Sequence, residues 1–262
     1  MKRLVTALAL ALVAIYLVGW APTPLFIAAA LLMSLLCYWE YSGLVAKHDI
    51  PRPGIFGFLA GLVILFLPEF ILPGVSILAV CAFVTSLRHD NLRDVLPQVA
   101  CAFLGAFYTF APWRFAIDLR ASSVHLLFFA LALNWVGDSV AYYIGRKFGK
   151  HKLAPVVSPG KSWEGAIASV CGAVLFGVLY LGHFVASIPW WQVALIAAVA
   201  SVAGQLGDLA ESAMKRGAGV KDSGNLLPGH GGMLDRVDSS LFALPVVYIL
   251  YHFSVWSGAG LH

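Results

Sequence analysis

The sequence predicts an all-α, polytopic integral membrane protein with about nine transmembrane helices and a cytoplasmic N-terminus. Three observations support this prediction: an apolar composition, apolar segments of membrane-spanning length, and a one-sided distribution of basic residues. Of the 262 residues, 60% are hydrophobic and only 11% are charged. Soluble domains have about 25% charged residues. This chain therefore has too few charges to cover a surface that faces water, and lipid is expected to be its main solvent.

Nine apolar segments, separated by short polar breaks, are the expected helices. Most have the roughly 20 residues that are needed to cross the hydrocarbon core of a bilayer. The third and fourth segments are short and are separated by prolines, so they form either two crossings or a re-entrant pair. The first segment is longer than the apolar core of a signal peptide, roughly 7–15 residues, and we expect it to be retained. The segments are 3–20, 24–42, 54–70, 71–87, 95–112, 122–145, 163–186, 189–214 and 234–256.

The basic residues test this count of helices. With the N-terminus in the cytoplasm, 15 of the 17 Lys and Arg residues fall on the cytoplasmic side, and only Arg114 and Arg120 fall on the other. Membrane proteins show such a bias toward the cytoplasm. A miscounted helix before residue 146 would scatter these charges over both faces.

The two parts of the chain differ in the polarity of their helices. Up to about residue 112 the expected helices carry almost no ionisable groups, whereas from Asn134 onward acids, amides and glycines occur at helix ends and in adjoining loops. Neither an internal repeat nor a long linker is visible in the sequence. We therefore expect a single membrane domain over 1–262, with a helical region of mainly structural role over 1–120 and a catalytic helical region over 121–262.

Acidic residues cluster at the ends of the last two expected helices. Acids at membrane depth are costly and mark functional sites. Asp208 and Glu211 end one helix near the cytoplasmic face, and Asp235 and Asp238 begin the next one there. Four carboxylates at one depth repel each other unless a cation compensates them. Oxygen ligands suit Mg²⁺, which completes its shell with phosphate oxygens. The alternative for each acid is a helix cap or an ion pair.

The segment that joins these two helices has the composition of an anion-binding loop. Six glycines fall between positions 217 and 232, and glycine lets backbone N–H groups approach an anion closely. The loop leads into a helix N-terminus, another favourable anion site. His230 is either a proton donor or phosphate ligand, or a structural residue, and a flexible connector is the alternative for the whole loop. The basic residues that suit phosphates here are Lys215, Arg216, Lys221 and Arg236.

Two further polar groups are expected to face this loop. Asp138 lies four residues after Asn134 and four before Tyr142, which places the three on one helix face. Glu164 begins a helix directly after the segment that contains Lys161. A metal-binding acid set beside a polyphosphate-binding loop is typical of phosphoryl and nucleotidyl transfer.

Six stretches of the chain carry a resemblance to a known family. They are 212–216 (SAMKR), 221–224 (KDSG), 227–238 (LPGHGGMLDRVD), 138–149 (DSVAYYIGRKFG), 158–165 (SPGKSWEG) and 207–212 (GDLAES). The first three resemble the signature of the phosphatidate cytidylyltransferases, also called CDP-diacylglycerol synthases, at every fixed position. The other three resemble further blocks of that family, which often has Lys in place of Gly160 and Thr in place of Ser162.

The resemblance implies an enzyme, a Mg²⁺-dependent nucleotidyltransferase of phospholipid biosynthesis. It would transfer CMP from CTP to phosphatidate and form CDP-diacylglycerol and pyrophosphate. It would be a homodimer in the cytoplasmic (inner) membrane, with no nucleic acid partner. The basic residues place its active site on the cytoplasmic side. The family is expected to hold Mg²⁺ and a second, monovalent cation such as K⁺ at the acid cluster.

Carried onto this chain, the metal ligands would be Asp208, Asp235 and Asp238. The expected catalytic residues are these three with Lys215, Arg216 and Lys221. The expected substrate-binding residues are Ser212, Asp222, His230, Gly231, Gly232, Arg236, Asp138, Lys161 and Glu164.

Two other functions stay open at this point. A CTP-dependent lipid kinase would attack the γ-phosphorus of CTP. A cation transporter would use the same acids and glycines as a path, but transporters typically show paired broken helices in two repeats, which this sequence lacks. A generic ATPase or dinucleotide enzyme is disfavoured, because the sequence has neither a G-x-x-x-x-G-K-[ST] loop nor a G-x-G-x-x-G turn after a strand.

Overall fold

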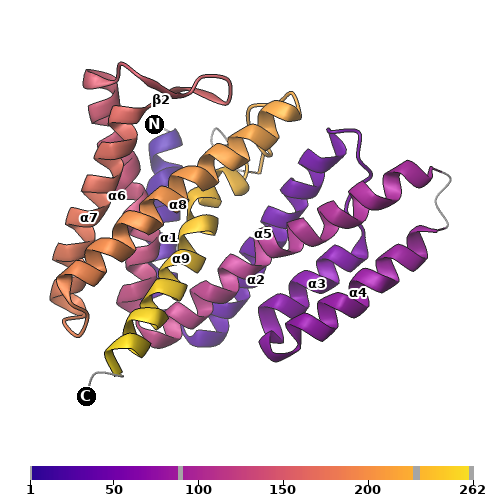
Figure 1. The fold of residues 1–262 in the computed structure, drawn as a ribbon, viewed down its shortest axis with the longest axis horizontal. Helices are drawn as coiled ribbons and strands as arrows, with labels where there is room; N and C mark the ends of the chain where they lie inside the picture. Colours follow the sequence, from indigo (N-terminus) through magenta and orange to yellow (C-terminus); the bar gives the residue numbers. More distant parts are fainter. Residues whose placement is uncertain (1, 88–90, 227–230, 260–262) are drawn as a thin grey trace. The chain divides into compact units, whose positions relative to one another are not determined.

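The computed structural model describes residues 2–87, 91–226 and 231–259, and these residues are largely helical (Figure 1). Each of the nine apolar segments forms an α-helix there. The helices are α1 (Lys2–Gly19), α2 (Thr23–Ala46), α3 (Ile55–Phe66), α4 (Ile71–Ser86), α5 (Val95–Ser122), α6 (Val124–Phe148), α7 (Trp163–Phe184), α8 (Trp190–Gly217) and α9 (Leu234–Ala259). Two 3₁₀ turns, η1 (Pro68–Phe70) and η2 (Leu92–Asp94), precede α4 and α5.

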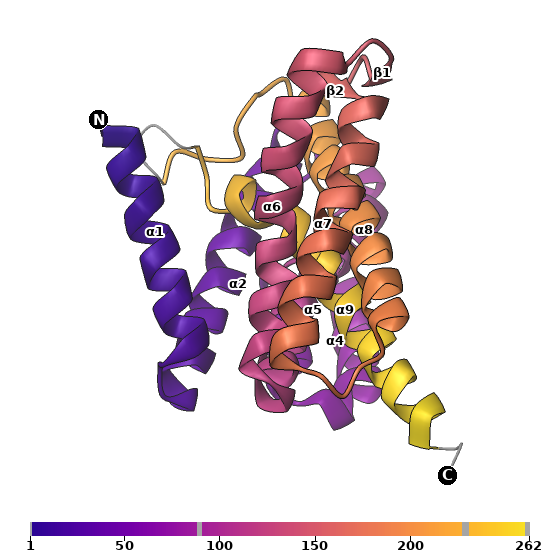
Figure 2. The ribbon, with the colours of Figure 1, turned by 90° about the vertical axis from the view of Figure 1, so that its left-hand side faces the viewer.

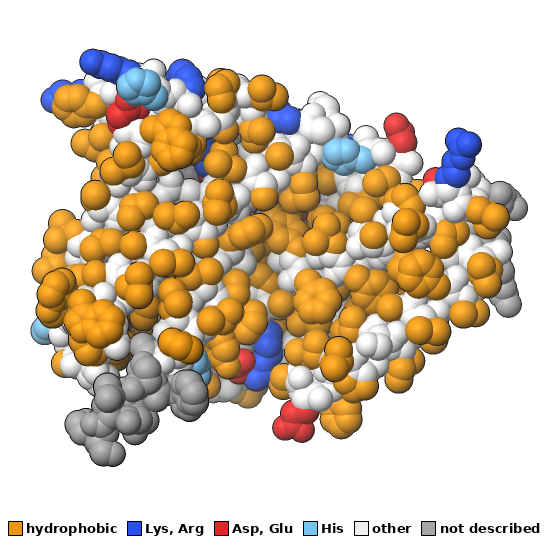
Figure 3. All heavy atoms as spheres, viewed as in Figure 1, with side chains coloured by type: hydrophobic (Ala, Val, Ile, Leu, Met, Phe, Trp, Pro, Cys, Tyr) orange, Lys and Arg blue, Asp and Glu red, His pale blue; other side chains and the backbone are white. Residues whose placement is uncertain are grey.

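Within the described residues, six helical segments are long and apolar enough to cross a membrane: α2, η1 with α4, η2 with α5, α6, α7 and α8. Hydrophobic side chains cover most of the face shown in Figure 3. Leu72 and Trp190, for example, are 80% and 71% exposed. These observations confirm the all-α polytopic membrane fold. The number of crossings and the side of the N-terminus stay predictions.

The short third helix bears on the predicted choice between two crossings and a re-entrant pair. α3 has 12 residues, which make about 18 Å at 1.5 Å per residue, whereas the hydrocarbon core of a bilayer is about 30 Å thick. It packs against α4, and η1 joins the two. α3 alone is therefore too short to cross a bilayer of ordinary thickness.

The helices belong to two compact units. The first contains α2, α3, α4 and most of α5, together with the described parts of the connection from Met214 to Val237. The second contains α6, α7, most of α8 and most of α9. The described parts of the connection between α8 and α9 thus group with the N-terminal helices.

In the first unit, glycines allow α3 and α5 to pack closely against their neighbours. A Cβ atom at Gly57 of α3 would collide with the Tyr38 hydroxyl and with the Ala102 carbonyl oxygen. One at Gly105 of α5 would collide with the Tyr41 ring. Tyr41 is 2% exposed, and its hydroxyl donates to the Cys101 carbonyl oxygen at 3.0 Å. Small residues at helix contacts are typical of membrane proteins, because they let backbones approach.

In the second unit, α6 and α7 lie side by side, with a short β-hairpin at one end (Figure 2). A Cβ atom at Gly137 of α6 would come within 2.6 Å of the Ser169 hydroxyl of α7. The hairpin pairs β1 (Lys152–Ala154) with β2 (Ser158–Ser162) in antiparallel orientation. Ser162 ends β2 and caps α7, because its hydroxyl accepts from the Gly165 amide at 3.2 Å. The sequence analysis did not predict these strands.

Candidate active site

The first polar group of the site lies in the first unit and joins the last turn of α8 to the first turn of α9. The Lys215 ammonium donates to Asp235 Oδ1 at 2.6 Å, and the two side chains are only 11% and 5% exposed. A buried charge pair is stable only where its remaining hydrogen-bonding capacity is used. The other carboxylate oxygen of Asp235 meets that requirement.

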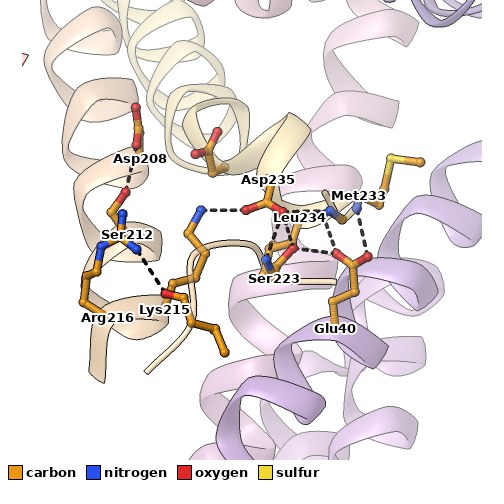
Figure 4. Close-up of polar contacts among 12 residues, drawn as sticks. Glu40, Asp208, Ser212, Lys215, Arg216, Ser223, Met233, Leu234 and Asp235 are labelled. Atoms are coloured by element: carbon orange, nitrogen blue, oxygen red, sulfur yellow. Dashed lines mark hydrogen bonds and ion pairs between the residues drawn. The ribbon is translucent and has the colours of Figure 1, made fainter. Parts of the chain in front are cut away.

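Asp235 Oδ2 has three hydrogen-bond donors of the loop between the helices within reach (Figure 4). The Ser223 and Gly232 amides donate at 2.9 Å and 2.7 Å, and the Ser223 hydroxyl, which Glu40 shares, lies at 2.9 Å. Both described ends of the loop are therefore fastened to one carboxylate. These donors and Lys215 stabilise its charged form.

Glu40 of α2 is a second carboxylate at this loop, and the sequence analysis missed it. It is 4% exposed and accepts from the Ser223 hydroxyl at 2.9 Å, the Met233 amide at 2.9 Å and the Leu234 amide at 2.8 Å (Figure 4). The signal for it was present, because an acid inside an apolar segment indicates function.

Glu40 and Asp235 change the expectation for the N-terminus of α9. The sequence predicts a favourable anion site at that helix start, with a helix cap by Asp235 as the alternative. Instead, the Gly232, Met233 and Leu234 amides donate to the protein's own carboxylates. Helix starts favour negative charge because their amides lack partners within the helix, and here Glu40 and Asp235 provide that charge.

Two glycines of the signature are required by this packing. Gly231 has φ +77°, a left-handed conformation that glycine adopts without strain. A Cβ atom at Gly232 would collide with the Ser223 hydroxyl and with the Glu40 carboxylate. Both residues thus shape the loop backbone.

The remaining basic residues of the loop are open to solvent. Arg216, Lys221 and Arg236 are exposed, as is Asp222. One Arg216 nitrogen donates to the Val220 carbonyl oxygen at 3.1 Å, which orients the guanidinium along the loop. His230, another predicted substrate-binding residue, lies outside the described residues.

A second polar group lies in the second unit and joins α8 to the β-hairpin. The Lys161 ammonium of β2 is 2.6 Å from Asp208 Oδ2, and the Ser212 hydroxyl donates to Asp208 Oδ1 at 3.3 Å. Asp138 of α6 lies within range of the charges of both Asp208 and Lys161. This group therefore contains two carboxylates for one lysine, and it carries an excess of negative charge.

Asp238 belongs to the second unit too, and a glycine brings its helix against α8. A Cβ atom at Gly207 would lie 2.8 Å from the Asp238 carbonyl oxygen and 2.7 Å from the Phe242 ring. The backbone of α9 thus passes directly beside the residue that precedes Asp208. The Asp238 carboxylate accepts from the Ser239 amide at 2.7 Å.

Glu164 makes a separate contact at the start of α7. Its carboxylate lies 2.7 Å from His151 Nδ1 and also accepts from the His151 amide at 3.3 Å. These bonds fix the first turn of α7 to the segment before β1. Glu164 thereby holds the hairpin that carries Lys161.

The predicted metal ligands are distributed over the two units, with Asp208 and Asp238 in the second and Asp235 in the first. Within residues 2–87, 91–226 and 231–259, no three His, Cys, Asp or Glu side chains are close enough together to hold a metal ion. Asp208 and Asp235 are both compensated by lysines.

Comparisons with known proteins agree on one family. A model described as the cytidylyltransferase family matches residues 1–254. A phosphatidate cytidylyltransferase of Staphylococcus haemolyticus is 36% identical over 250 residues, which cover 90% of this chain and 92% of that protein. One of Staphylococcus aureus (strain COL) is 33% identical over 228 residues, 84% and 86% of the two chains. One of Staphylococcus saprophyticus is 39% identical over 153 residues, 58% and 59% of the two chains.

Proposed function

The chain belongs to the cytidylyltransferase family, and we propose that it transfers CMP from CTP to phosphatidate, forming CDP-diacylglycerol and pyrophosphate. The observation that carries this proposal is the 36% identity to a phosphatidate cytidylyltransferase over nine-tenths of both chains. The exposed Arg216, Lys221 and Arg236 beside a glycine-rich loop support it, because such groups suit a polyphosphate.

The reaction is a displacement at the α-phosphorus of CTP. A phosphate oxygen of phosphatidate forms the new P–O bond, the bond to the bridging oxygen breaks, and pyrophosphate leaves with the electron pair. The attacking phosphate is already ionised at neutral pH, so a strong general base is not required. The tasks of the protein are positioning and charge neutralisation, and Lys215, Arg216, Lys221 and Arg236 serve the phosphates in this proposal. The other residues proposed to bind substrate are Ser212, Asp222, His230, Gly231, Gly232, Asp138, Lys161 and Glu164.

The proposal includes Mg²⁺, held by Asp208, Asp235 and Asp238, and a second, monovalent cation such as K⁺. The second unit supplies two carboxylates, Asp208 and Asp138, for one lysine, and oxygen donors suit Mg²⁺. Asp235 Oδ1 already accepts from the Lys215 ammonium. A metal ion that binds this oxygen must therefore replace the ammonium. When bound, the ion would neutralise charge on the phosphates.

Removal of the metal tests this part of the proposal. Chelation followed by dialysis should abolish CMP transfer, and Mg²⁺ should restore it in a saturable manner. Activity that is indifferent to chelation would exclude the metal role. Titration with K⁺ at saturating Mg²⁺ tests the second cation separately.

The site is proposed to face the cytoplasm, in the inner membrane, and the protein to act as a homodimer. The cytoplasmic side is supported by the 15 basic residues that share it under the predicted topology. The homodimer follows from the family resemblance alone. Reporter fusions after Ala46 and Gly217 test the side, and crosslinking in native membranes tests the dimer.

One labelling experiment separates the proposed function from its rivals. With phosphatidate in mixed micelles, label from [α-³²P]CTP should enter the lipid and label from [γ-³²P]CTP should leave as pyrophosphate. A lipid kinase would instead transfer the γ-label to the lipid and leave the α-label in CDP. Ion flux into proteoliposomes without CTP, and no lipid labelling, would favour the transporter.

A further inference from the structure

We infer that Glu40, in an N-terminal helix outside the signature, is a positioning residue that holds the CTP-binding loop in its working conformation. This inference rests on the proposed function. Glu40 lies on α2, and its partners Ser223, Met233 and Leu234 lie more than 180 residues away in the chain. All four residues belong to the first unit.

The partners of Glu40 occupy both described ends of the loop. Ser223 follows the basic segment that contains Lys221, and Met233 and Leu234 lead directly into Asp235. Each carboxylate oxygen accepts from a backbone amide, Oε1 from Met233 and Oε2 from Leu234. Oε2 also lies 2.9 Å from the Ser223 hydroxyl. One buried side chain therefore fixes the separation of the two loop ends.

Ser223 couples Glu40 to Asp235. Its hydroxyl oxygen is 2.9 Å from Glu40 Oε2 and 2.9 Å from Asp235 Oδ2. A hydroxyl has one proton to donate, so it bonds to one carboxylate at a time while the Ser223 amide stays on Asp235. The Glu40, Ser223 and Asp235 side chains thus form one hydrogen-bonded chain that ends at Lys215.

A carboxylate is an unexpected choice beside a loop that binds a triphosphate. Its negative charge repels the ligand, so its presence needs a compensating role. That role is to accept hydrogen bonds from the Met233 and Leu234 amides, which are buried and have no other hydrogen-bond acceptor among the described residues. Left free, those amides would compete for phosphate oxygens at the wrong place, while Lys221 and Arg236 remain exposed for CTP.

The test is the steady-state kinetics of Glu40→Ala and Glu40→Gln in the full-length protein. The Ala variant should raise the KM for CTP about tenfold, the size expected when hydrogen bonds to a charged group are lost. The KM for phosphatidate should stay within twofold. The KM for CTP of Glu40→Gln should lie between those of the wild type and the Ala variant. The glutamine oxygen can still accept one hydrogen bond, but its NH₂ group cannot accept from the second backbone amide. Should the Ala variant fail to fold, the Gln variant decides alone.

Ser34→Ala is the matched control. Ser34 is fully buried on the same helix, and among the described residues its hydroxyl donates to the Ala30 carbonyl oxygen of its own helix alone, at 2.9 Å. It should leave both KM values unchanged. A merely structural role of Glu40 would lower the amount of active enzyme without changing the KM for CTP, and that result overturns the inference.

A readout without substrate separates this inference from the proposed function. Hydrogen exchange at the Ser223, Met233 and Leu234 amides should accelerate in Glu40→Ala and stay at the wild-type rate in Ser34→Ala. Unchanged exchange at these amides overturns the positioning role even if the wild type transfers CMP. A wild type that transfers no CMP, with accelerated exchange in the variant, contradicts the proposed function and leaves the loop-holding contact in place.

Discussion

The Lys215–Asp235 pair of the first unit and the Lys161–Asp208 pair of the second have the same 2.6 Å separation but different surroundings. Asp235 is 5% exposed, and besides the lysine it accepts from two loop amides and shares the Ser223 hydroxyl with Glu40. Asp208 is 29% exposed and receives one serine hydroxyl, while a second carboxylate, Asp138, lies in range. The first pair therefore holds backbone in place, and the second keeps negative charge that can meet a cation.

This difference teaches that an acid in a signature can serve two purposes. A carboxylate saturated with N–H and O–H donors contributes mainly by fixing the loop. A carboxylate whose only cation is a partly exposed lysine can exchange it for a metal or yield it to a phosphate. Substitutions that remove charge but keep shape distinguish the two roles.

The largest effect is expected for Asp208→Asn. It removes charge from the group with excess carboxylate, so kcat should fall about a thousandfold, as when a key electrostatic contact is lost. Stability should change by less than about 1 kcal/mol, because the pair is partly solvated. Initial rates and the thermal midpoint in detergent check both parts. Glu69→Gln, at an exposed acid of η1, is the control, and near-normal rates for Asp208→Asn would refute its catalytic role.

A large effect on stability is expected for Asp235→Asn. It leaves the buried Lys215 ammonium without its carboxylate, which costs about 3 kcal/mol or more, and it also removes a proposed metal ligand. Both the thermal midpoint and kcat should therefore fall, in contrast to Asp208→Asn. A variant that is inactive yet as stable as the wild type would show that the Lys215–Asp235 pair does not stabilise the fold.

The helices follow from composition, because a chain with so few charges must satisfy its backbone internally in lipid. Their ends follow less well. Segment 95–112 was expected to stop at Pro112, yet α5 continues to Ser122 with that proline inside. The β-hairpin was not expected at all, since 152–162 read as a polar loop without strand alternation.

The site could be predicted only in part for a similar reason. The acids, basic residues and glycines of the signature are local patterns, visible in one stretch of sequence. The contacts of Glu40 with Ser223 and Leu234 span more than 180 residues, and no local pattern encodes them. Likewise, helical spacing did not indicate that loop amides would donate hydrogen bonds to the Asp235 carboxylate. Nor did it indicate that the Asp208 carboxylate would receive a serine hydroxyl instead.

The smallest effect is expected for Gly207→Ala. This substitution tests whether the polar group around Asp208 needs the close packing of α9 against α8. The new Cβ atom would lie 2.8 Å from the Asp238 carbonyl oxygen and 2.7 Å from the Phe242 ring, so α9 must shift away from α8 beside Asp208. Overpacking of this kind costs about 1–3 kcal/mol, and kcat should fall about tenfold if the Asp208 and Asp238 helices must stay in register.

Gly182→Ala is the matched control for this substitution. Gly182 lies in α7 of the same unit, and a Cβ atom there meets nothing within 4 Å. Since alanine favours helix over glycine by up to about 1 kcal/mol, this control should be neutral or slightly more stable. Equal thermal midpoints and equal rates for the two variants would mean that the close approach of α8 and α9 at Gly207 is not needed. The second group would then depend on its side-chain charges alone.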